Sequence, residues 1–168
     1  MAHSIDEIDA KILELLQRDG RMKRSDVAEE VNLSLSAVSE RMRKLEARGV
    51  IEGYRAIVDA KRLHFDITAF IRVSVDGSEH YADFVERVTD MDEVLELHSI
   101  TGSGSHVMKV RTENTTTLER FLSEIQAIPG VSKTTTSITL STFKETRAVS
   151  TEPMELYDYD EGDSPAAD

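Results

Sequence analysis

Residues 34–49 read Ser34-Leu35-Ser36-Ala37-Val38-Ser39-Glu40-Arg41-Met42-Arg43-Lys44-Leu45-Glu46-Ala47-Arg48-Gly49. Val38, Met42 and Leu45 recur at intervals of four and three residues, which places them on one side of a helix. Basic residues followed by Gly49 are typical of a helix end, because they suit the negative end of the helix dipole and the left-handed backbone beyond it. The stretch therefore predicts an amphipathic helix over residues 36–48.

The polar side of this predicted helix has the composition of a DNA-reading surface. Its side chains are Ser36, Ala37, Glu40, Arg43 and Lys44, with Arg41 at the flank. Small residues near a helix N-terminus allow close approach to base edges, and cations further along meet phosphates or guanine edges. Glu40 repels phosphate, although its carboxylate can accept a hydrogen bond from a cytosine amino group. A solvated face of a three-helix bundle has the same composition, so the helical projection alone leaves both interpretations open.

Two shorter amphipathic patterns precede this helix. The first starts with Ser4-Ile5-Asp6-Glu7, which matches a capping box, and is expected to stop near Asp19-Gly20. The second is expected to begin after Ser25 as its N-cap and to end near Asn32, so that a tight turn leads to the third helix. Two helices joined by a short turn, the second of them free to enter the major groove, constitute a helix-turn-helix.

Further candidates for DNA contact lie near the predicted helix starts. They are Ser25, Ser34 (the predicted N-cap of the third helix, with Ser36 as the alternative), Arg21, Lys23 and Arg24. Hydroxyls and free N–H groups at a helix N-terminus suit phosphate oxygens, and basic side chains add electrostatic attraction. We therefore predict double-stranded DNA as a partner of the chain.

The segment behind the third helix is expected to complete the first domain. Residues 50–58 are apolar at first and contain Gly53, which predicts a broken strand or a small wing. An N-terminal winged helix-turn-helix domain is thus expected over residues 1–58. Residues 59–64 are polar and basic without a period, and they are the predicted linker.

From residue 65 onward the pattern changes to strands that alternate with helices. Strands are expected at 67–75, 94–101, 106–111 and 131–143, helices at 80–90 and 115–127, and a Gly-Ser turn at 102–105. This doubled β-α-β order is that of the ferredoxin-like βαββαβ arrangement, an antiparallel sheet with both helices on one face. The fold class is therefore predicted to be α+β, with the second domain over residues 65–147. The uncovered sheet face predicts a homodimer, because exposed apolar side chains there need a partner.

The acidic residues are unevenly distributed. The formal net charge is -12; residues 1–55 hold ten Lys and Arg against eleven Asp and Glu, whereas residues 150–168 hold seven acids and no cation. An acidic surface opposes attraction to phosphates unless salt screens it. This excess, with Arg outnumbering Lys, predicts a halophile as the source. Residues 148–168 lack any lasting period, so we expect an acidic, disordered tail there.

Several classes of protein are excluded or disfavoured. The chain has no Cys, which excludes disulfides, thiolate zinc sites and cysteine nucleophiles. Its apolar runs are too short for a membrane span and its N-terminus lacks a signal-peptide pattern, so a cytoplasmic protein without a membrane partner is expected. His98 and His106 are too few for a structural metal site, and no cofactor is predicted. Ser103, Ser105 and His106 are close in sequence, but the turn at 102–105 joins two strands and does not match a nucleophile elbow, so no catalytic residue is predicted.

Motifs in both halves of the chain resemble one known family. They are Ile8-Asp9-Ala10-Lys11-Ile12-Leu13, Asp19-Gly20-Arg21, Leu33-Ser34, Val38-Ser39-Glu40-Arg41-Met42-Arg43-Lys44-Leu45-Glu46, Gly49-Val50-Ile51-Glu52-Gly53-Tyr54, Val94 to Gly102, Pro129-Gly130-Val131, Thr134 and Thr136. In order and spacing, over about residues 4 to 147, they look like the leucine-responsive/asparagine-type (Lrp/AsnC) regulators of bacteria and archaea. The resemblance implies a winged helix-turn-helix, a dimerising amino-acid-sensing domain, and assembly into dimers, tetramers or octamers.

The resemblance also implies an effector pocket between dimers. In the family, a Gly-Asp-x-Asp turn after the second strand of the sensing domain and hydroxyls of the last strand form this pocket. The matching positions are Gly102, Ser103, Ser105, the adjoining His106, Thr134 and Thr136. Both acidic positions are serine in this chain, and a hydroxyl attracts an ammonium group far more weakly than a carboxylate does. A neutral or acidic amino acid is the predicted effector, with a ligand-free hairpin turn as the alternative.

Two other functions stay open at this point. Sirohaem decarboxylases resemble this two-domain architecture, and they would need His and Arg side chains around a tetrapyrrole; those near the second domain are His98, His106, Arg72 and Arg111. A DNA-organising protein without an effector would bind broadly and with little sequence preference. The predicted function is a non-enzymatic transcription regulator, in which each subunit of a homodimer inserts its third helix into the major groove of a pseudo-palindromic site.

Overall fold

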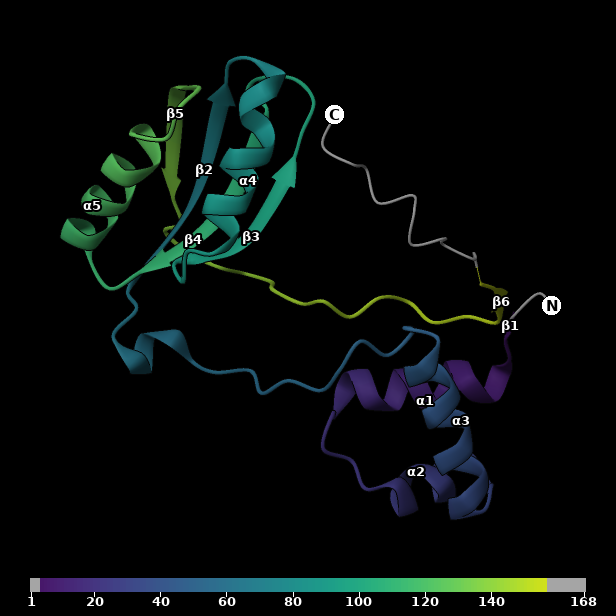
Figure 1. Ribbon diagram of the computed structural model, residues 1–168. Helices are drawn as coiled ribbons and strands as arrows, with labels where there is room; N and C mark the ends of the chain where they lie inside the picture. Colours follow the sequence, from purple (N-terminus) through teal and green to yellow (C-terminus); the bar gives the residue numbers. More distant parts are fainter. Residues whose placement is uncertain (1–3, 157–168) are drawn as a thin grey trace. The chain divides into compact units, whose positions relative to one another are not determined.

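The computed structural model describes residues 4–156 of the chain (Figure 1). The described residues up to Ile57, together with those from Glu145 onward, form one compact unit, and Val58–Lys144 form the other. Each unit has a hydrophobic core of its own. The end of the described chain thus belongs to the same unit as its beginning.

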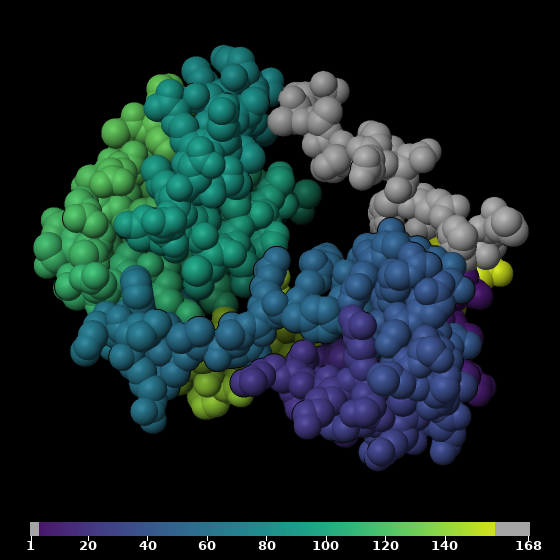
Figure 2. Space-filling model, turned by 60° about the horizontal axis from the view of Figure 1, so that its bottom comes forward, coloured from purple at the N-terminus to yellow at the C-terminus, as the bar shows by residue number. Residues whose placement is uncertain are grey.

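The first unit is built around three helices, α1 (Glu7–Arg18), α2 (Arg24–Glu30) and α3 (Leu35–Ala47). Their apolar stripes meet in one core, in which Val38, Met42 and Leu45 of α3 are 0 to 4% exposed. Ile12 of α1 and Val27 of α2 complete its centre, and Figure 2 shows the purple and blue atoms of this unit packed as one body. Burial of one such side chain stabilises the fold by roughly 1.5–3 kcal/mol. The predicted apolar side of α3 is confirmed, and its polar side is left to the solvent.

The start of α1 differs from the prediction. The N-cap is Asp6, whose carboxylate accepts the N–H of Asp9 at 2.7 Å. Ser4, the predicted cap, instead lies in a two-residue strand, β1 (Ser4–Ile5). A carboxylate caps a helix as well as a hydroxyl does, so the local sequence offers two starts. The strand pairing of β1 selects the later one.

The starts of α2 and α3 give one correction and one confirmation. α2 begins one residue before Ser25, after Lys23, and the Ser25 hydroxyl donates to Asp26 at 2.9 Å instead of capping the helix. α3 is capped by Ser34, which accepts the N–H of Ala37 at 3.2 Å, as predicted. The turn between α2 and α3 is short, which is the geometry that a helix-turn-helix requires.

The described end of the chain lies against α1. Its last strand, β6 (Met154–Glu155), pairs antiparallel with β1. The side-chain amide of Gln17 donates to the carbonyl of Val149 at 3.0 Å and accepts its N–H at 2.8 Å, and the Thr151 hydroxyl donates to the carbonyl of Ala10 at 3.1 Å. The predicted disorder is therefore wrong for residues 149–156, because these bonds satisfy polar groups that composition alone would leave to water. The rest of the predicted tail, residues 157–168, lies outside the described residues.

The segment behind α3 contains no strand. Gly49, with φ +69°, ends the helix in the left-handed conformation, and Val50 and Ile51 pack against the core. Residues 52–59 are exposed and irregular, so the strand predicted over 50–58 does not form. A strand needs a partner for its backbone groups, and none of the described strands lies beside this segment. A short 3-10 helix, η1 (Ala60–Leu63), occupies the predicted linker.

The second unit is an antiparallel sheet with two helices on one face (Figure 1). Its strands are β2 (Ile67–Val75), β3 (Val94–Ser99), β4 (His106–Thr112) and β5 (Val131–Ile138), in the order β3-β4-β2-β5. Its helices are α4 (Tyr81–Thr89), preceded by the 3-10 turn η2 (Ser78–His80), and α5 (Thr115–Gln126). All neighbouring strands run antiparallel. This is the predicted ferredoxin-like βαββαβ arrangement.

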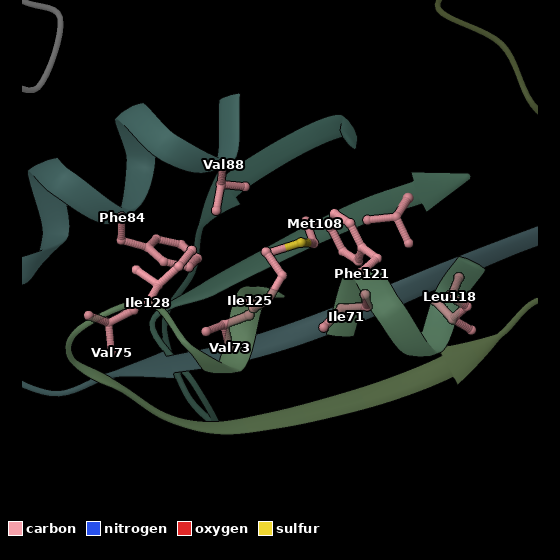
Figure 3. Close-up of a cluster of buried hydrophobic side chains, with 12 residues drawn as sticks. Ile71, Val73, Val75, Phe84, Val88, Met108, Leu118, Phe121, Ile125 and Ile128 are labelled. Atoms are coloured by element: carbon pink, nitrogen blue, oxygen red, sulfur yellow. The ribbon is translucent and has the colours of Figure 1, made fainter. Parts of the chain in front are cut away.

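Alternation along the strands sorts side chains between the two sheet faces. Ala69, Ile71 and Val73 of β2 are fully buried beneath the helices, whereas Phe70 and Arg72 are exposed on the open face. Figure 3 shows the buried side chains of strands and helices pointing toward one another. Among those labelled there are Ile71, Val73, Phe84, Val88, Met108, Leu118, Phe121 and Ile125.

β5 is shorter than predicted. It ends at Ile138, before the predicted end at Phe143. The N–H of Thr139 still donates to the carbonyl of Thr68 at 2.8 Å, but β2 begins at Ile67, so little backbone remains beside it to pair with. Phe143 itself is 97% exposed.

Candidate functional site

The polar side of α3 carries most of the predicted DNA contacts. Ser36, Glu40, Arg43 and Lys44 are exposed there, and Ala37 is half-buried at their edge. The other candidates near the helix starts, Arg21, Lys23, Arg24, Ser25 and Ser34, are also exposed. The structure therefore leaves all these residues on the surface of the first unit, where a duplex can reach them.

Glu40 pairs with both cations of this face. Its carboxylate accepts from Nε of Arg43 at 2.9 Å and from Nη2 at 2.8 Å, and Nζ of Lys44 lies 3.7 Å away. The hydrogen bond from Arg43 holds the pKa of Glu40 below its ordinary value, so the carboxylate is charged. Exposed ion pairs of this kind are weak in water. A phosphate can therefore replace Glu40 as the partner of Arg43.

Arg41, a predicted DNA contact, is engaged within the protein. Its Nη1 donates to Asp9 at 2.8 Å and to Asp6 at 2.7 Å, both at the start of α1. These hydrogen bonds, to Asp9 first, raise the pKa of Arg41. Asp9 is only 8% exposed, and a buried carboxylate needs a partner. The flank position of Arg41 on α3 therefore turns its guanidinium toward α1, where it joins the two helices.

Two glycines shape the predicted effector turn. Gly102 has φ +101° and Gly104 has φ +94°, conformations that other residues rarely adopt. At Gly104 an added Cβ would also lie 3.0 Å from the carbonyl oxygen of Val73 in β2. The turn thus approaches β2 closely at Gly104, and glycine is required there by both backbone angle and space.

Ser105 holds this turn against β2 through hydrogen bonds of its backbone and its hydroxyl. Its backbone N–H donates to the carbonyl of Val73 at 2.9 Å, and its Oγ accepts the N–H of Val75 at 3.1 Å. The same Oγ lies 2.9 Å from Nδ1 of His106. Ser105, a predicted effector contact, is therefore already occupied by bonds within the protein.

His106 lies in the core beneath the turn. Its side of β4 faces the helices, and the residue is 3% exposed. Its ring contacts Tyr81 edge-on, with centroids 5.3 Å apart, and Phe84 at 4.9 Å. Burial lowers the pKa of His106, which favours the neutral ring. Of the predicted turn residues, Gly102 and Ser103 are the exposed ones.

Thr134 and Thr136 lie on β5, on the other side of β2. Thr134 is paired with Val73, and both threonines are half-buried on the side of the sheet that the helices cover. The Thr134 hydroxyl accepts a hydrogen bond from the amide of Gln126 in α5 at 2.9 Å. Ser105 and Thr134 thus lie on opposite sides of Val73. They are two strand spacings apart, which is roughly 10 Å. The structure brings the turn and Thr134 to the same end of the sheet, with Thr136 further along.

The residues of the tetrapyrrole alternative do not converge. Strand register pairs His98 with Val107 and puts His106 one position further, so the two rings project from opposite sheet faces. Arg72 and Arg111 share the open face with His98. Among residues 4–156, no group of three or more His, Asp or Glu side chains is placed to hold a metal ion. None of the described helices combines the length and the hydropathy that a membrane span requires.

Sequence reasoning missed a groove between β1 and α3. It has a volume of about 400 Å³, and it is lined by Ser4, Asp9, Ala37, Glu40, Arg41, Lys44, Leu45 and Arg48. No local pattern predicts it, because it forms only where β1 lies beside α3. The spacing of Lys44 and Arg48, four residues apart on one helix flank, was the one sequence signal that could have placed Arg48 beside Lys44.

Comparisons with known proteins agree with this architecture. Residues 5–52 match a winged helix-turn-helix DNA-binding model, and residues 68–149 match the Lrp/AsnC ligand binding domain. The HTH-type transcriptional regulator FL11 of Pyrococcus abyssi is 38% identical over 146 residues, which cover 87% of this chain and 96% of that protein. The HTH-type transcriptional regulator LrpA of Mycobacterium tuberculosis is 33% identical, with 88% and 97% covered.

Solved structures give the same result. A transcriptional regulator of Neisseria meningitidis in complex with L-Met has a TM-score of 0.83 at 28% identity, covering 86% of this chain and 95% of its own. A feast or famine regulatory protein of M. tuberculosis complexed with L-methionine has a TM-score of 0.81 at 32% identity, covering 86% and 98%. The DNA-binding and ligand-binding models match different units, and the relatives extend over both. The chain therefore belongs to the Lrp/AsnC family of DNA-binding transcription regulators.

Proposed function

We propose that this chain recognises specific DNA sites with the polar side of α3 and thereby regulates transcription. The observation that carries the proposal is the exposure of Ser36, Arg43 and Lys44 on one side of the second helix of a helix-turn-helix. Arg43 and Lys44 meet phosphates or guanine edges, while the small residues at the helix N-terminus allow close approach to bases. Arg21, Lys23, Arg24, Ser25 and Ser34 contact the phosphate backbone on either side.

We propose that the working form is a homodimer joined through the open sheet face. Phe70 is 45% exposed there, and Val107 of the neighbouring strand faces the same side. An apolar patch of this kind favours burial against a second copy. Such a dimer presents two α3 helices to half-sites about one DNA turn apart, roughly 34 Å. Assembly of dimers into tetramers or octamers, as the family resemblance implies, is part of the same proposal.

We infer that the turn at 102–105 and Thr134 form part of a site for a neutral or acidic amino acid. The solved structures of two similar proteins are complexes with L-methionine, which supports an amino-acid ligand. Gly102 and Ser103 are exposed and offer backbone N–H groups and one hydroxyl. Since both acidic positions of the family turn are serine, a cationic side chain finds no carboxylate at the turn. Isothermal titration with methionine, leucine, glutamate and lysine tests this; heat from lysine alone, or from none of the four, contradicts it.

The DNA proposal is tested by Arg43→Ala combined with Lys44→Ala. The probe is a duplex that the wild-type chain selects from a random-sequence library, and affinity is measured by gel retardation. We expect a loss on the order of 100-fold and a weaker salt dependence, because two cations per subunit no longer meet the duplex. Arg87→Ala is the matched control, since Arg87 is an exposed helical cation paired with Asp83 in the second unit. Size-exclusion chromatography checks that the dimer persists.

Three outcomes would contradict the proposed function. Undiminished retardation of the selected duplex by the double variant would remove α3 as the recognition helix. Equal retention of all duplexes would indicate the DNA-organising alternative. A haem-like absorption band in the purified protein would favour the decarboxylase alternative.

We propose that the protein works in the cytoplasm of a halophilic archaeon. The formal net charge of -12 supports this, because molar salt screens both the repulsion among acids and their repulsion of DNA. Thermal unfolding measured at increasing KCl is the test. A rising melting temperature up to molar KCl is expected, and a melting temperature independent of KCl would contradict the proposal.

A further inference from the structure

The C-terminal segment is fastened to the DNA-binding unit along its length. Val149 is held by two hydrogen bonds to Gln17, and β6 is paired with β1 so that Ser4 lies opposite Glu155. Leu156, the last described residue, packs half-buried against the core of the three helices. The residues that follow therefore start at the surface of this unit.

This starting point lies beside the groove between β1 and α3. Ser4 lines the groove and is the residue paired with Glu155. The α3 side of the groove includes Glu40, Lys44 and Arg48. Because Leu156 follows Glu155 directly, the chain leaves β6 one residue from a position that borders the groove. The described part of the chain thus ends beside the groove.

The groove and the following segment have complementary charges. The carboxylates of the groove are compensated within the protein, Asp9 by Arg41 and Glu40 by Arg43. Arg48 is exposed and makes no ion pair within the part of the chain that the structure describes. Residues 157–168 hold five Asp and Glu and no Lys or Arg. An acidic peptide is therefore the kind of occupant that the cations at the groove favour.

The segment is long enough to cover the helix. Its twelve residues span up to roughly 40 Å when extended, whereas the 13 residues of α3 extend over about 20 Å. A short tether also keeps a segment at an effective concentration on the order of millimolar near its site. Individually weak ion pairs are then sufficient for substantial occupancy.

We propose that residues 157–168 dock in this groove, where their carboxylates take the place of DNA phosphates on Lys44 and Arg48. Ala37, Glu40 and Lys44 line the groove and also belong to the candidate DNA-binding side of α3. The docked segment therefore competes with DNA for the same helix. Docking is a property of the free chain, while its effect on DNA rests on the proposed function of α3.

Nuclear magnetic resonance tests docking without DNA. The full chain is compared with a chain ending at Leu156, which keeps β6, at the lowest KCl concentration at which both are folded. We expect the backbone amides of residues 40–48 to shift on truncation, those of α5 to stay, and the free peptide 157–168 to restore the shifts. Unchanged amides at 40–48 would overturn the proposal. Shifts in the full chain that grow with protein concentration would also overturn it, since the tail of a second copy would then fill the groove.

Fluorescence anisotropy with the selected duplex tests competition. The truncated chain is expected to bind about three- to tenfold more tightly, and less so as KCl rises. Arg48→Gln is the matched variant, because it weakens the groove without removing a predicted DNA contact. In that background the gain on truncation should shrink. If truncation raises DNA affinity equally with and without Arg48, the tail acts by long-range repulsion alone, and docking is overturned. If no chain binds DNA, the proposed function of α3 is contradicted, and the amide shifts decide docking.

Discussion

The polar side of α3 and the turn at 102–105 differ in how much of their hydrogen-bonding capacity the protein already uses. On the polar side of α3, Arg43 and Lys44 pair with Glu40 of the same exposed helix. At the turn, Ser105 is bonded to β2 and His106 is buried beneath α4. A helix has a side that packing does not reach, so its polar groups stay available to a partner. A turn between two strands is shaped by whichever strand lies beside it, here β2.

This difference predicts that Gly104→Ala has the largest effect on the stability of the protein. The left-handed φ and the 3.0 Å approach of the new Cβ to the carbonyl oxygen of Val73 both oppose alanine. We expect a loss of about 1–3 kcal/mol in the free energy of unfolding, measured by thermal and urea unfolding. Gly102→Ala is the matched control, since its φ is also positive but no atom lies within 4 Å of the added Cβ. Equal losses would contradict the view that close approach to β2 fixes the turn.

The helical side of this comparison was largely predictable from the sequence, and the turn was not. Val38, Met42 and Leu45 define the buried side of α3 by their spacing alone, so the opposite side follows without further information. The positions of Ser105 and Thr134 depend on strand register, which brings both beside Val73 although they lie about 30 and about 60 residues from it in sequence. No local pattern contains that information.

The same reason explains the error at the C-terminus. Met154 and Glu155 form a strand only because β1 lies beside them, almost a whole chain length away in sequence. Composition correctly marks the segment as acidic, but it carries no signal for a two-residue pairing. Arg41 is a related case, because its flank position on α3 is compatible with DNA or with α1 until Asp6 and Asp9 are placed.

Arg41→Ala and Arg43→Ala divide α3 into a structural and a DNA-binding part. Arg41→Ala is expected to leave Asp9 unpaired and to lower the free energy of unfolding by about 1 kcal/mol. The value is small because solvent partly screens the ion pair. Arg43→Ala should leave unfolding unchanged and weaken DNA binding. Urea unfolding and anisotropy, measured on both variants, check the division. Loss of DNA affinity with unchanged stability in Arg41→Ala would contradict it.

The Arg41 contact also has a pH dependence of known sign. Burial works to raise the pKa of Asp6, but the N–H of Asp9 and the Arg41 guanidinium outweigh it, and the pKa is lowered from 3.8. The contribution of Asp6 to stability is therefore present above pH 3.8 and is lost as the pH falls through the lowered value. Acid unfolding curves of the wild type should show this loss, and those of Arg41→Ala should show less of it.

Glu40→Gln tests whether the ion pairs of Arg43 and Lys44 with Glu40 lower the affinity of the protein for DNA. The amide keeps the shape of the side chain but removes the charge that Arg43 and Lys44 face. We expect roughly two- to fivefold tighter binding of the selected duplex, the range of one exposed ion pair. Anisotropy at low and high KCl checks this, because the gain should shrink with salt. Weaker binding would instead indicate that Glu40 accepts a hydrogen bond from a base.

The smallest expected effect concerns His106 and the pH dependence of the second unit. Burial lowers the pKa of His106 below 6.5. Between this lowered pKa and pH 6.5, the ring is protonated in the unfolded chain but neutral in the folded chain. Its contribution to stability is then present above pH 6.5 and is lost as the pH falls below it. His106→Phe keeps an aromatic ring against Tyr81 and Phe84 without a titrating group.

The difference between wild type and His106→Phe isolates this titration from that of the surface acids, because the same acids are present in both chains. Urea unfolding at pH 7.5 and pH 5.5 should show a larger loss at low pH in the wild type. The Ser105 hydroxyl keeps its bond from the N–H of Val75 in the variant, so the turn should stay in place. If both proteins lose the same stability, the ring takes up its proton in the folded state. The turn would then be open to water, and it would resemble the side of α3 in offering free groups to a ligand.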